Sequence, residues 1–240
     1  ISAVAAAAHV IILVFSKDLG SAVIFFAGYL IMVFIATKNY FYLFAGILGG
    51  AGASIVAYHM FSHVRTRVIA FLHPWSNIND SGYQITQSLF AIGTGGWFGL
   101  GIDQGDPTSI PYVEQDFIFS AVAEEMGVIF GICLILVCVS CFIVFMKIAM
   151  QLKEDFYRYI AVGISTIYIF QVFLTIGGGT RFIPLTGVTL PLVSYGGSSV
   201  LTTIIMFSII QGLYCIQSQE GKRNVRKERR RTADREAGEE

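Results

Sequence analysis

Residues 116–146, DFIFSAVAEEMGVIFGICLILVCVSCFIVFM, form the stretch that decides the fold. The carboxylate Asp116 stands immediately before an apolar run that reaches Met146. A helix of ~20 predominantly apolar residues spans the hydrocarbon core of a bilayer, so this run predicts a transmembrane helix. Ionisable groups at or inside a bilayer are costly and tend to mark sites. Asp116, at the edge of the membrane, is therefore the first candidate for a functional residue.

The composition extends this interpretation to the whole chain. Of the 240 residues, 55% are hydrophobic and 13% are charged, whereas soluble domains average about 25% charged residues. Apolar runs predict spans at residues 4–15, 21–37, 41–61, 117–146, 157–176 and 198–216. The sequence thus predicts an all-α, polytopic helical membrane protein whose membrane domain covers residues 1–216. Because the first run is short for ~30 Å of hydrocarbon, we expect residues upstream of this chain to be missing.

Basic residues in the short loops predict the orientation of these spans. Half of all Lys and Arg lie in the tail, residues 217–240, and others follow the second and fourth spans at Lys38, Lys147 and Lys153. With six spans, all these segments fall on one side, which is therefore expected to be cytoplasmic. The tail interleaves basic with acidic residues, and we expect it to be disordered.

The connection at residues 62–116 falls on the opposite, extracytoplasmic side and is far longer than the usual connection. Its aromatic residues argue against disorder, and residues 82–92 carry apolar positions at helical spacing. We expect amphipathic or re-entrant helices there, joined by glycine turns. The glycine-rich residues 93–101 lack the Lys-Ser/Thr of a nucleotide-binding loop. They are interpreted as turns that let the backbone pass close to membrane or substrate.

Charged residues of the outer segments are the candidate site residues. Arg65 and Arg67 follow the third span, Arg181 lies in the last outer loop, and Asp116 opens the fourth span. Contact with lipid headgroups is the alternative for the arginines, and a helix N-cap worth ~1 kcal/mol is the alternative for Asp116. Being two residues apart, Arg65 and Arg67 would point in nearly opposite directions from a helix, whereas from an extended segment they would share a face.

Two further carboxylates, Glu124 and Glu125, lie inside the apolar run. A bare carboxylate in lipid costs several kcal/mol, so at least one is expected to face protein or water. On a helix, Asp116, Ser120 and Glu124 line one broad face and would form a polar track descending from the outer surface. A structural salt bridge is the rival explanation for the two glutamates.

Several short motifs occur together in this chain. They are KDLG (17–20), GYQ (82–84), QS (87–88), AIGTGG (91–96), DFIF (116–119), EEMG (124–127), PLTGV (184–188) and LPLVSYGGSS (190–199). Through them the chain resembles the SEDS family (shape, elongation, division and sporulation), whose members include RodA, FtsW and SpoVE. Two positions depart from the family pattern: Ser16-Lys17 stands where Gln-Pro is more usual, and Glu114-Gln115 where His-Thr is common. Family members have ten spans, so the six expected here would be the last six.

The resemblance implies a peptidoglycan glycosyltransferase that polymerises glycan strands from lipid II, with Asp116 as the essential carboxylate. Asp116 would take the proton of the acceptor hydroxyl or would hold a divalent cation, Mg²⁺ or Mn²⁺. Arginines or that cation would stabilise the diphosphate leaving group. The expected substrate-binding residues are Arg65, Arg67, Arg181, Gln84, Glu124 and Ser194.

The resemblance also implies a setting and partners. The setting is the bacterial cytoplasmic membrane with the site on its outer face, and the partners are lipid II, the growing glycan strand and a class B penicillin-binding protein. Two other functions stay open on the residues alone: a transporter that flips lipid II without chemistry, and a scaffold for cell-wall enzymes. The polar track through Glu124 favours a transporter, whereas a carboxylate and arginines on one outer face favour an enzyme.

Overall fold

The computed structural model describes residues 2–78 and 80–236, with side chains described as far as residue 219. The α-helices are α1 (Ser2–Phe15), α2 (Leu19–Thr37), α3 (Tyr40–Met60), α4 (Ser62–Leu72), α5 (Tyr83–Gly95), α6 (Ile118–Gln151), α7 (Asp155–Gly179) and α8 (Gly197–Glu236). Two short 3₁₀ helices, η1 (Trp75–Asn77) and η2 (Pro107–Ser109), interrupt the long connections. No strand occurs among the described residues. The all-α fold expected from the sequence is confirmed.

The predicted spans correspond to α1, α2, α3, α6, α7 and α8. In the described part of the chain, five of these helices are long and apolar enough to cross a membrane, and the protein is a helical membrane protein. The sixth, α1, has 14 residues and is shorter than a span, as its sequence suggested. The helix expected at residues 82–92 is α5.

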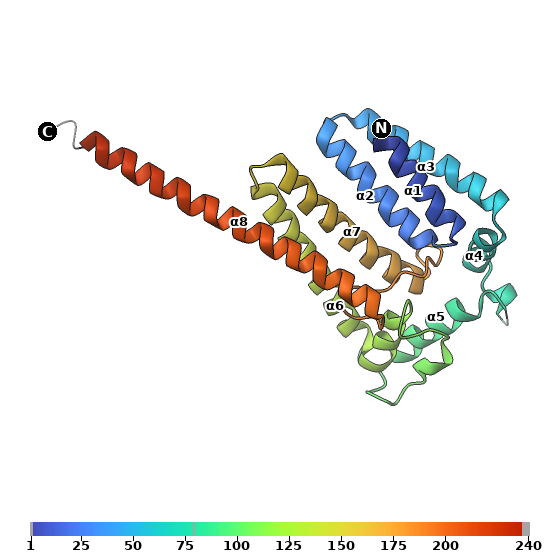
Figure 1. The fold of residues 1–240 in the computed structure, drawn as a ribbon. Coiled ribbons are helices and arrows are strands. Elements are labelled where there is room, and N and C mark those ends of the chain that lie inside the picture. The colour runs from blue at the N-terminus through green and yellow to red at the C-terminus, as the bar shows by residue number, and fades with distance from the viewer. Residues whose placement is uncertain (1, 79, 237–240) are drawn as a thin grey trace.

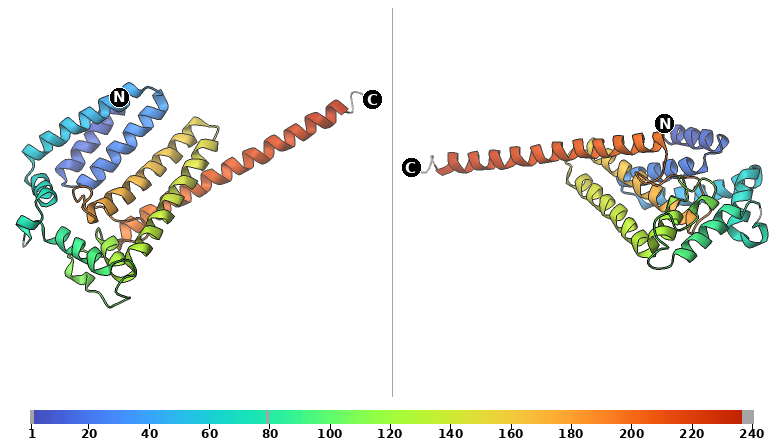
Figure 2. Two further views of the ribbon diagram at one scale, coloured as in Figure 1. Left: turned by 180° about the vertical axis from the view of Figure 1, so that it is seen from behind. Right: turned by 90° about the horizontal axis from the view of Figure 1, so that it is seen from below.

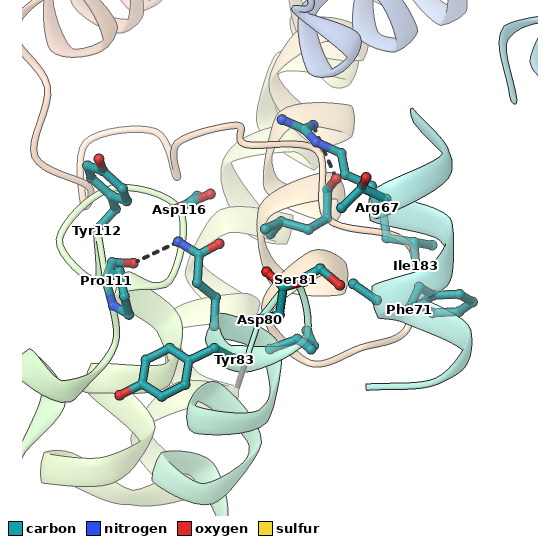
Figure 3. A pocket seen from close by; sticks show the side chains of 14 residues that line it. Arg67, Phe71, Asp80, Ser81, Tyr83, Pro111, Tyr112, Asp116 and Ile183 are labelled. Atoms are coloured by element: carbon teal, nitrogen blue, oxygen red, sulfur yellow. Dashed lines mark hydrogen bonds between the residues drawn. The ribbon is translucent and has the colours of Figure 1, made fainter. Parts of the chain in front are cut away.

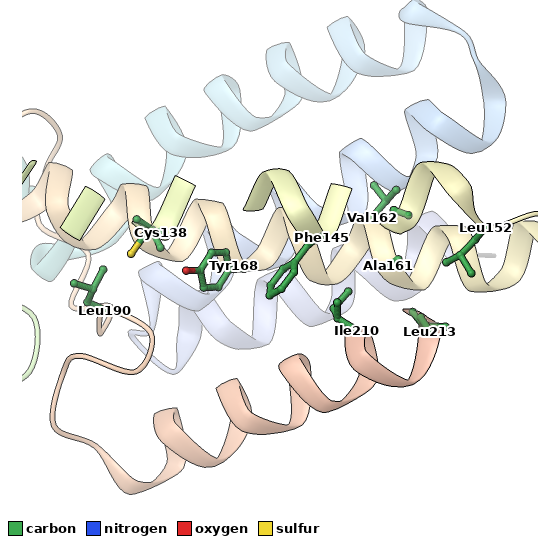
Figure 4. Close-up of a cluster of buried hydrophobic side chains, with 11 residues drawn as sticks. Cys138, Phe145, Leu152, Ala161, Val162, Tyr168, Leu190, Ile210 and Leu213 are labelled. Atoms are coloured by element: carbon green, nitrogen blue, oxygen red, sulfur yellow. The ribbon is translucent and has the colours of Figure 1, made fainter. Parts of the chain in front are cut away.

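Helix α7 is the centre of the bundle, packed between α2 on one side and α6 on the other, with α8 lying across α6 and α7 (Figure 1). In its apolar window 61% of the residues are buried, against none in that of α3. Figure 4 shows buried side chains of the core between α6, α7 and α8. In this core the ring of Phe145 lies 5.4 Å from that of Tyr168 and 4.9 Å from that of Phe207. The outer faces of α3 and α8 carry exposed apolar side chains, as expected of surfaces that meet lipid.

The two ends of the bundle differ. Figures 1 and 2 show α4, α5, the α1–α2 turn and the α7–α8 connection gathered at one end. The opposite end carries the α2–α3 turn, with Lys38, and the α6–α7 turn. Segments expected outside the membrane thus lie together, apart from the basic segments expected in the cytoplasm.

The expectation of a disordered tail stays a prediction, although the structure gives most of the tail a helical backbone. Residues 217–236 continue α8 as a helix that extends beyond the bundle (Figure 1). Lys, Arg, Glu and Gln dominate this segment, and all four are strong helix formers. The remaining tail residues, 237–240, lie outside the described part of the chain.

The sequence did not predict that α6 is interrupted at Gly127, where φ is 86° and ψ is 166°. The glycine-rich segment 96–101 fills the interruption with its own backbone. The two segments are joined by hydrogen bonds from Leu100 N to Glu124 O (2.9 Å), from Gly101 N to Glu125 O (2.9 Å) and from Val128 N to Gly96 O (3.0 Å). Backbone groups freed by a broken membrane helix need such partners, because lipid offers none. The close approach of these glycines, which was expected toward membrane or substrate, is made to α6.

Candidate functional site

A pocket of about 520 Å³ lies at the end of the bundle that carries α4 and α5 (Figure 3). Its walls come from α4, the connection before α5, the start of α5, the segment before α6 and the last outer loop. The lining residues are Thr66, Arg67, Ala70, Phe71, Asp80, Ser81, Tyr83, Gln84, Ile85, Pro111, Tyr112, Asp116, Ile183 and Leu185. Segments that are far apart in the sequence, and that are expected outside the membrane, therefore meet around Asp116.

Asp116 is partly buried in this pocket and does not cap α6. The N-cap of α6 is Phe117, which has no side-chain capping bond. Burial raises the pKa of the Asp116 carboxyl above its usual range, while a backbone hydrogen bond and the nearby Arg67 oppose that rise. A carboxylate with a raised pKa is a better proton acceptor than an ordinary surface aspartate.

Arg67 is the predicted arginine that the structure places in the pocket. Its Nη1 donates hydrogen bonds to the carbonyls of Leu185 (3.2 Å) and Thr186 (2.9 Å), which hold α4 against the last outer loop. Because α4 is helical, Arg65 points away and lies over the ring of Tyr58, 5.8 Å from its centroid. The two arginines therefore do not converge, as the helical alternative required.

Arg181, unlike Arg67, contacts the end of α4. Its Nε donates to the carbonyl of Phe71 at 3.0 Å and its Nη2 to that of Leu72 at 3.4 Å, so it binds the C-terminal end of α4. Cations at this end of a helix satisfy carbonyls that have no partner within the helix. Arg181 is not among the residues that line the pocket. Its observed contacts fasten the wall that carries Arg67.

Gln84 lines the pocket as predicted, and its Nε2 donates to the carbonyl of Pro111 at 3.4 Å. Asp80, Tyr83 and Tyr112 also line the pocket but were not among the predicted site residues. The motif Gly82-Tyr83-Gln84 was the signal for the first two, because neighbours of a site motif commonly share its pocket. Tyr112 has a φ of 60°, and the sequence gives no sign of that conformation.

Ser194 lies outside this pocket and holds the segment before Asp116. Its buried hydroxyl donates to the carbonyl of Gln115 and accepts from the amide of Leu190 at 2.8 Å. The amide of Tyr195 adds a hydrogen bond of 2.7 Å to the carbonyl of Glu114. The last outer loop thus fixes the backbone on which Asp116 is carried.

Glu124 is also outside the pocket. It is 7% exposed and its Oε1 accepts from the amide of Asp106 at 3.3 Å, while Oε1 of Glu125 accepts from that of Asp103 at 3.3 Å. In the described part of the chain, neither glutamate forms the salt bridge considered above. Both carboxylates instead hold the loop that covers the interruption of α6.

The predicted polar track does not run open from Asp116 to Glu124. Between them, the hydroxyl of Ser120 lies 2.6 Å from that of Ser88, which donates to the carbonyl of Gly179 at 2.7 Å. Both Ser88 and Ser120 are fully buried. These contacts join α5, α6 and α7, and they explain why a serine stands at motif position 88 and another at position 120.

The pocket supplies carboxylates from Asp116 and Asp80 and the side-chain oxygen of Gln84. Across the described residues, no group of three His, Cys, Asp or Glu side chains is arranged to hold a metal ion. Mg²⁺ commonly takes only one or two carboxylates and completes its shell with phosphates and water. The protein donors alone therefore do not form a complete cation site, and the predicted cation at Asp116 stays a prediction.

Comparison with known proteins matches the whole membrane domain to one family. The model of the FtsW, RodA and SpoVE family, described as cell cycle protein, matches residues 1–219. Peptidoglycan glycosyltransferase RodA of Mycobacterium tuberculosis is 39% identical over 200 residues, which cover 83% of this chain and 42% of that protein. Stage V sporulation protein E of Bacillus subtilis is 34% identical over 199 residues, which cover 82% of this chain and 54% of that protein.

A chain from a solved peptidoglycan synthase complex shares the fold, with a TM-score of 0.75 at 24% identity over 90% of this chain and 61% of that chain. The chain described here spans about half the length of the curated relatives it matches. The family model covers nearly all of the chain outside its tail, and the motifs around the pocket are those of the SEDS resemblance. The chain belongs to the FtsW/RodA/SpoVE family of cell cycle proteins.

Proposed function

We propose that the protein containing this chain polymerises peptidoglycan glycan strands from lipid II. Its site would be the Asp116 pocket, on the extracytoplasmic face of the bacterial cytoplasmic membrane. The observation that carries the proposal is a carboxylate with a raised pKa that shares a pocket with an arginine. Relatives named peptidoglycan glycosyltransferase support it.

Asp116 supplies the base of this reaction. It takes the proton of the acceptor sugar hydroxyl while that oxygen forms a bond to the anomeric carbon of the donor sugar. The bond from the anomeric carbon to the diphosphate oxygen breaks, and the electron pair leaves with the polyprenyl diphosphate. A partly desolvated carboxylate suits the first task, because its raised pKa increases its affinity for the proton.

Arg67 faces the negative charge that grows on the leaving diphosphate. It is the one Arg or Lys among the residues that line the pocket in the described chain. Its Nη1 is held by two carbonyls, so the guanidinium is already oriented before substrate binds. An oriented cation in a partly dry site stabilises developing charge better than a mobile one. In the alternative in which Asp116 holds a divalent cation instead of taking the proton, that cation would supply stabilisation of the diphosphate.

We also propose a class B penicillin-binding protein, a transpeptidase, as the partner that receives the growing strand. The proposal rests on family membership and on the fold shared with a chain of a complex that coordinates polymerization and crosslinking. Copurification of the full-length protein with that transpeptidase would test it.

The direct test of the function is incubation of the purified full-length protein with lipid II, followed by gel separation of the products. Formation of glycan polymer supports the enzyme. Transfer of fluorescent lipid II between leaflets of a vesicle without polymer would support the transporter instead. Neither polymer nor transfer, in protein that still binds cell-wall enzymes, would support the scaffold.

The pH dependence of polymerisation provides a prediction for Arg67. The rate should rise with pH as Asp116 loses its proton, because only the carboxylate can accept the proton of the acceptor. The positive charge of Arg67 lowers the pKa of Asp116. Arg67→Gln should therefore move the acidic limb of kcat/KM to higher pH, in addition to lowering the maximum rate.

Arg65→Gln is the matched control, since its guanidinium lies over Tyr58 outside the pocket. It should leave the acidic limb where the wild type has it. An unshifted limb for Arg67→Gln, or equal shifts for both variants, would show that Arg67 does not act on Asp116.

Membrane orientation supplies another prediction. In full-length protein whose cysteines, including the four of this chain, are replaced by serine or alanine, a cysteine at Thr108 should react with an impermeant maleimide added to intact cells. A cysteine at Ser218 should not react until the membrane is opened. The reason is that Lys and Arg are concentrated in the tail and in the loops at the same end of the bundle, and such an excess is typical of the cytoplasmic side. The reverse labelling pattern would place the Asp116 pocket in the cytoplasm and contradict the proposed reaction.

A further inference from the structure

Helix α4 and the last outer loop, residues 180–196, are tied together by two arginines, each of which bonds to the backbone of the other segment. Arg67 of α4 donates from Nη1 to two carbonyls of the loop, at 3.2 and 2.9 Å, and Figure 3 shows the bond to Leu185. Arg181 of the loop donates from Nε and Nη2 to the last two carbonyls of α4, at 3.0 and 3.4 Å. We call these reciprocal contacts the arginine clasp.

Helix α4 is not held in place by a buried core. None of its 11 residues is buried, whereas α5 has buried residues along its length. In the chain as described, every hydrogen bond between α4 and the last outer loop belongs to the two arginines of the clasp. The clasp is therefore what fixes α4, and the side chain of Arg67 with it, against this loop.

The backbone conformation of Arg181 is unfavourable for an arginine. This residue follows the C-cap of α7 with a φ of 57°. Its amide donates to the carbonyl of Gly178 at 3.2 Å, and the amide of Phe182 donates to that of Gly177 at 2.8 Å. Such a helix-ending turn usually has glycine at the position of Arg181, because a side chain makes the left-handed conformation costly. The contacts of the side chain, and not the turn, therefore account for an arginine here.

The last outer loop also holds the segment that carries Asp116. Ser194 and the amide of Tyr195 bond to the two residues before this aspartate, as described above. In turn, Gln171 and Thr175 of α7 donate to carbonyls of the loop at 3.0 and 2.9 Å. One loop, fastened to the centre of the bundle, is therefore the common support of the carboxylate and the arginine that share the pocket.

We propose that Arg181 is a positioning residue, which closes the clasp and thereby sets the place of Arg67 relative to Asp116. Its importance for polymerisation rests on the proposed function, whereas its effect on the pocket does not. Neither arginine lies within the motifs that carry the family resemblance. The clasp is thus inferred from the contacts of this chain and not from those motifs.

The charge of Arg67 provides a way to observe its position. It lowers the pKa of Asp116, whereas Arg181 has no direct part in that effect. The last outer loop contributes only apolar side chains to the pocket, and the other titratable side chains that line it are Asp80, Tyr83 and Tyr112. The clasp bonds to none of these three. Opening the clasp should therefore act on Asp116 through Arg67.

Infrared titration of the full-length protein in nanodiscs tests this without substrate, because the carboxyl band that disappears in Asp116→Asn reports the protonation of Asp116. Arg181→Gly removes the side chain of the clasp and keeps the turn, so the fold should survive. It should move the titration midpoint of Asp116 to higher pH, as Arg67→Gln does. In the Arg67→Gln background it should add little further shift, since both changes remove one interaction. Arg65→Gln, on another face of α4, should leave the midpoint unchanged.

Polymerisation of lipid II by the same variants separates the positioning role from the proposed reaction. Arg181→Gly should lower kcat roughly tenfold to a hundredfold, since a misplacement of about 1 Å can cost that much. Arg181→Lys keeps a cation at the end of α4 and should recover part of the loss. Midpoint shifts in a protein whose wild type makes no polymer would overturn the reaction and leave the positioning role standing. A midpoint that ignores Arg181→Gly, or a shift of equal size with and without Arg67, would overturn the positioning role.

Discussion

Asp116→Asn should lower polymerisation of lipid II by about a hundredfold to ten-thousandfold, the range lost when a general base is removed. The amide keeps the size of the carboxylate but cannot take the proton of the acceptor hydroxyl. The side chain caps no helix and lies partly buried in the pocket, so the fold should survive the change. Rates of polymer formation by purified full-length protein, with the amount of folded protein matched, measure the effect.

Asp103→Asn is the control for this experiment. Asp103 belongs to the same outer connection and has a φ of 64°, a conformation that asparagine also accepts, but it does not line the pocket. It should polymerise lipid II at close to the wild-type rate. If Asp116→Asn did the same, the carboxylate would not be the base, and the base would have to be sought among the other lining residues, Asp80 first.

The helices were predictable because apolar length alone determines a membrane span. The runs at 21–37 and 41–61 became α2 and α3 with boundaries shifted by only one or two residues. Asp116 was predictable for a related reason: a carboxylate next to a long apolar run must be either satisfied or functional. Motif order then connected it to Gln84, and both line the same pocket.

The roles of Arg181, Ser194 and Glu124 were not predictable, because each depends on contacts between segments far apart in the sequence. Arg181 binds the end of α4 across 109 or 110 residues of chain, and Ser194 binds Gln115 across 79. Such contacts hold the walls of the site, and nothing in the local sequence separates a residue that holds a wall from one that meets a substrate. The interruption of α6 at Gly127 was not predictable either, because an isolated glycine in an apolar run is compatible with an unbroken helix.

Gly127→Ala should destabilise the fold by about 3 kcal/mol or more, because the backbone at Gly127 occupies a region that essentially only glycine adopts. A Cβ at this position would also lie 2.4 Å from the carbonyl oxygen of Trp97 and 2.5 Å from the amide of Gly99. To relieve this clash, segment 96–101 would have to move out of the interruption of α6. The backbone groups on both sides would then lose their hydrogen bonds. Thermal unfolding in detergent, followed by tryptophan fluorescence, should show a clearly lower midpoint.

Gly49→Ala is the matched control, since Gly49 lies within α3 and has no atom within 4 Å of an added Cβ. Alanine is the better helix former, so this variant should unfold at the wild-type temperature or slightly above. The connection that fills the interruption leads directly to Asp116, so Gly127→Ala should lose stability and polymerisation together, whereas Asp116→Asn should lose polymerisation alone. A Gly127→Ala protein with wild-type midpoint and rate would show that neither the fold nor the site needs the interruption of α6.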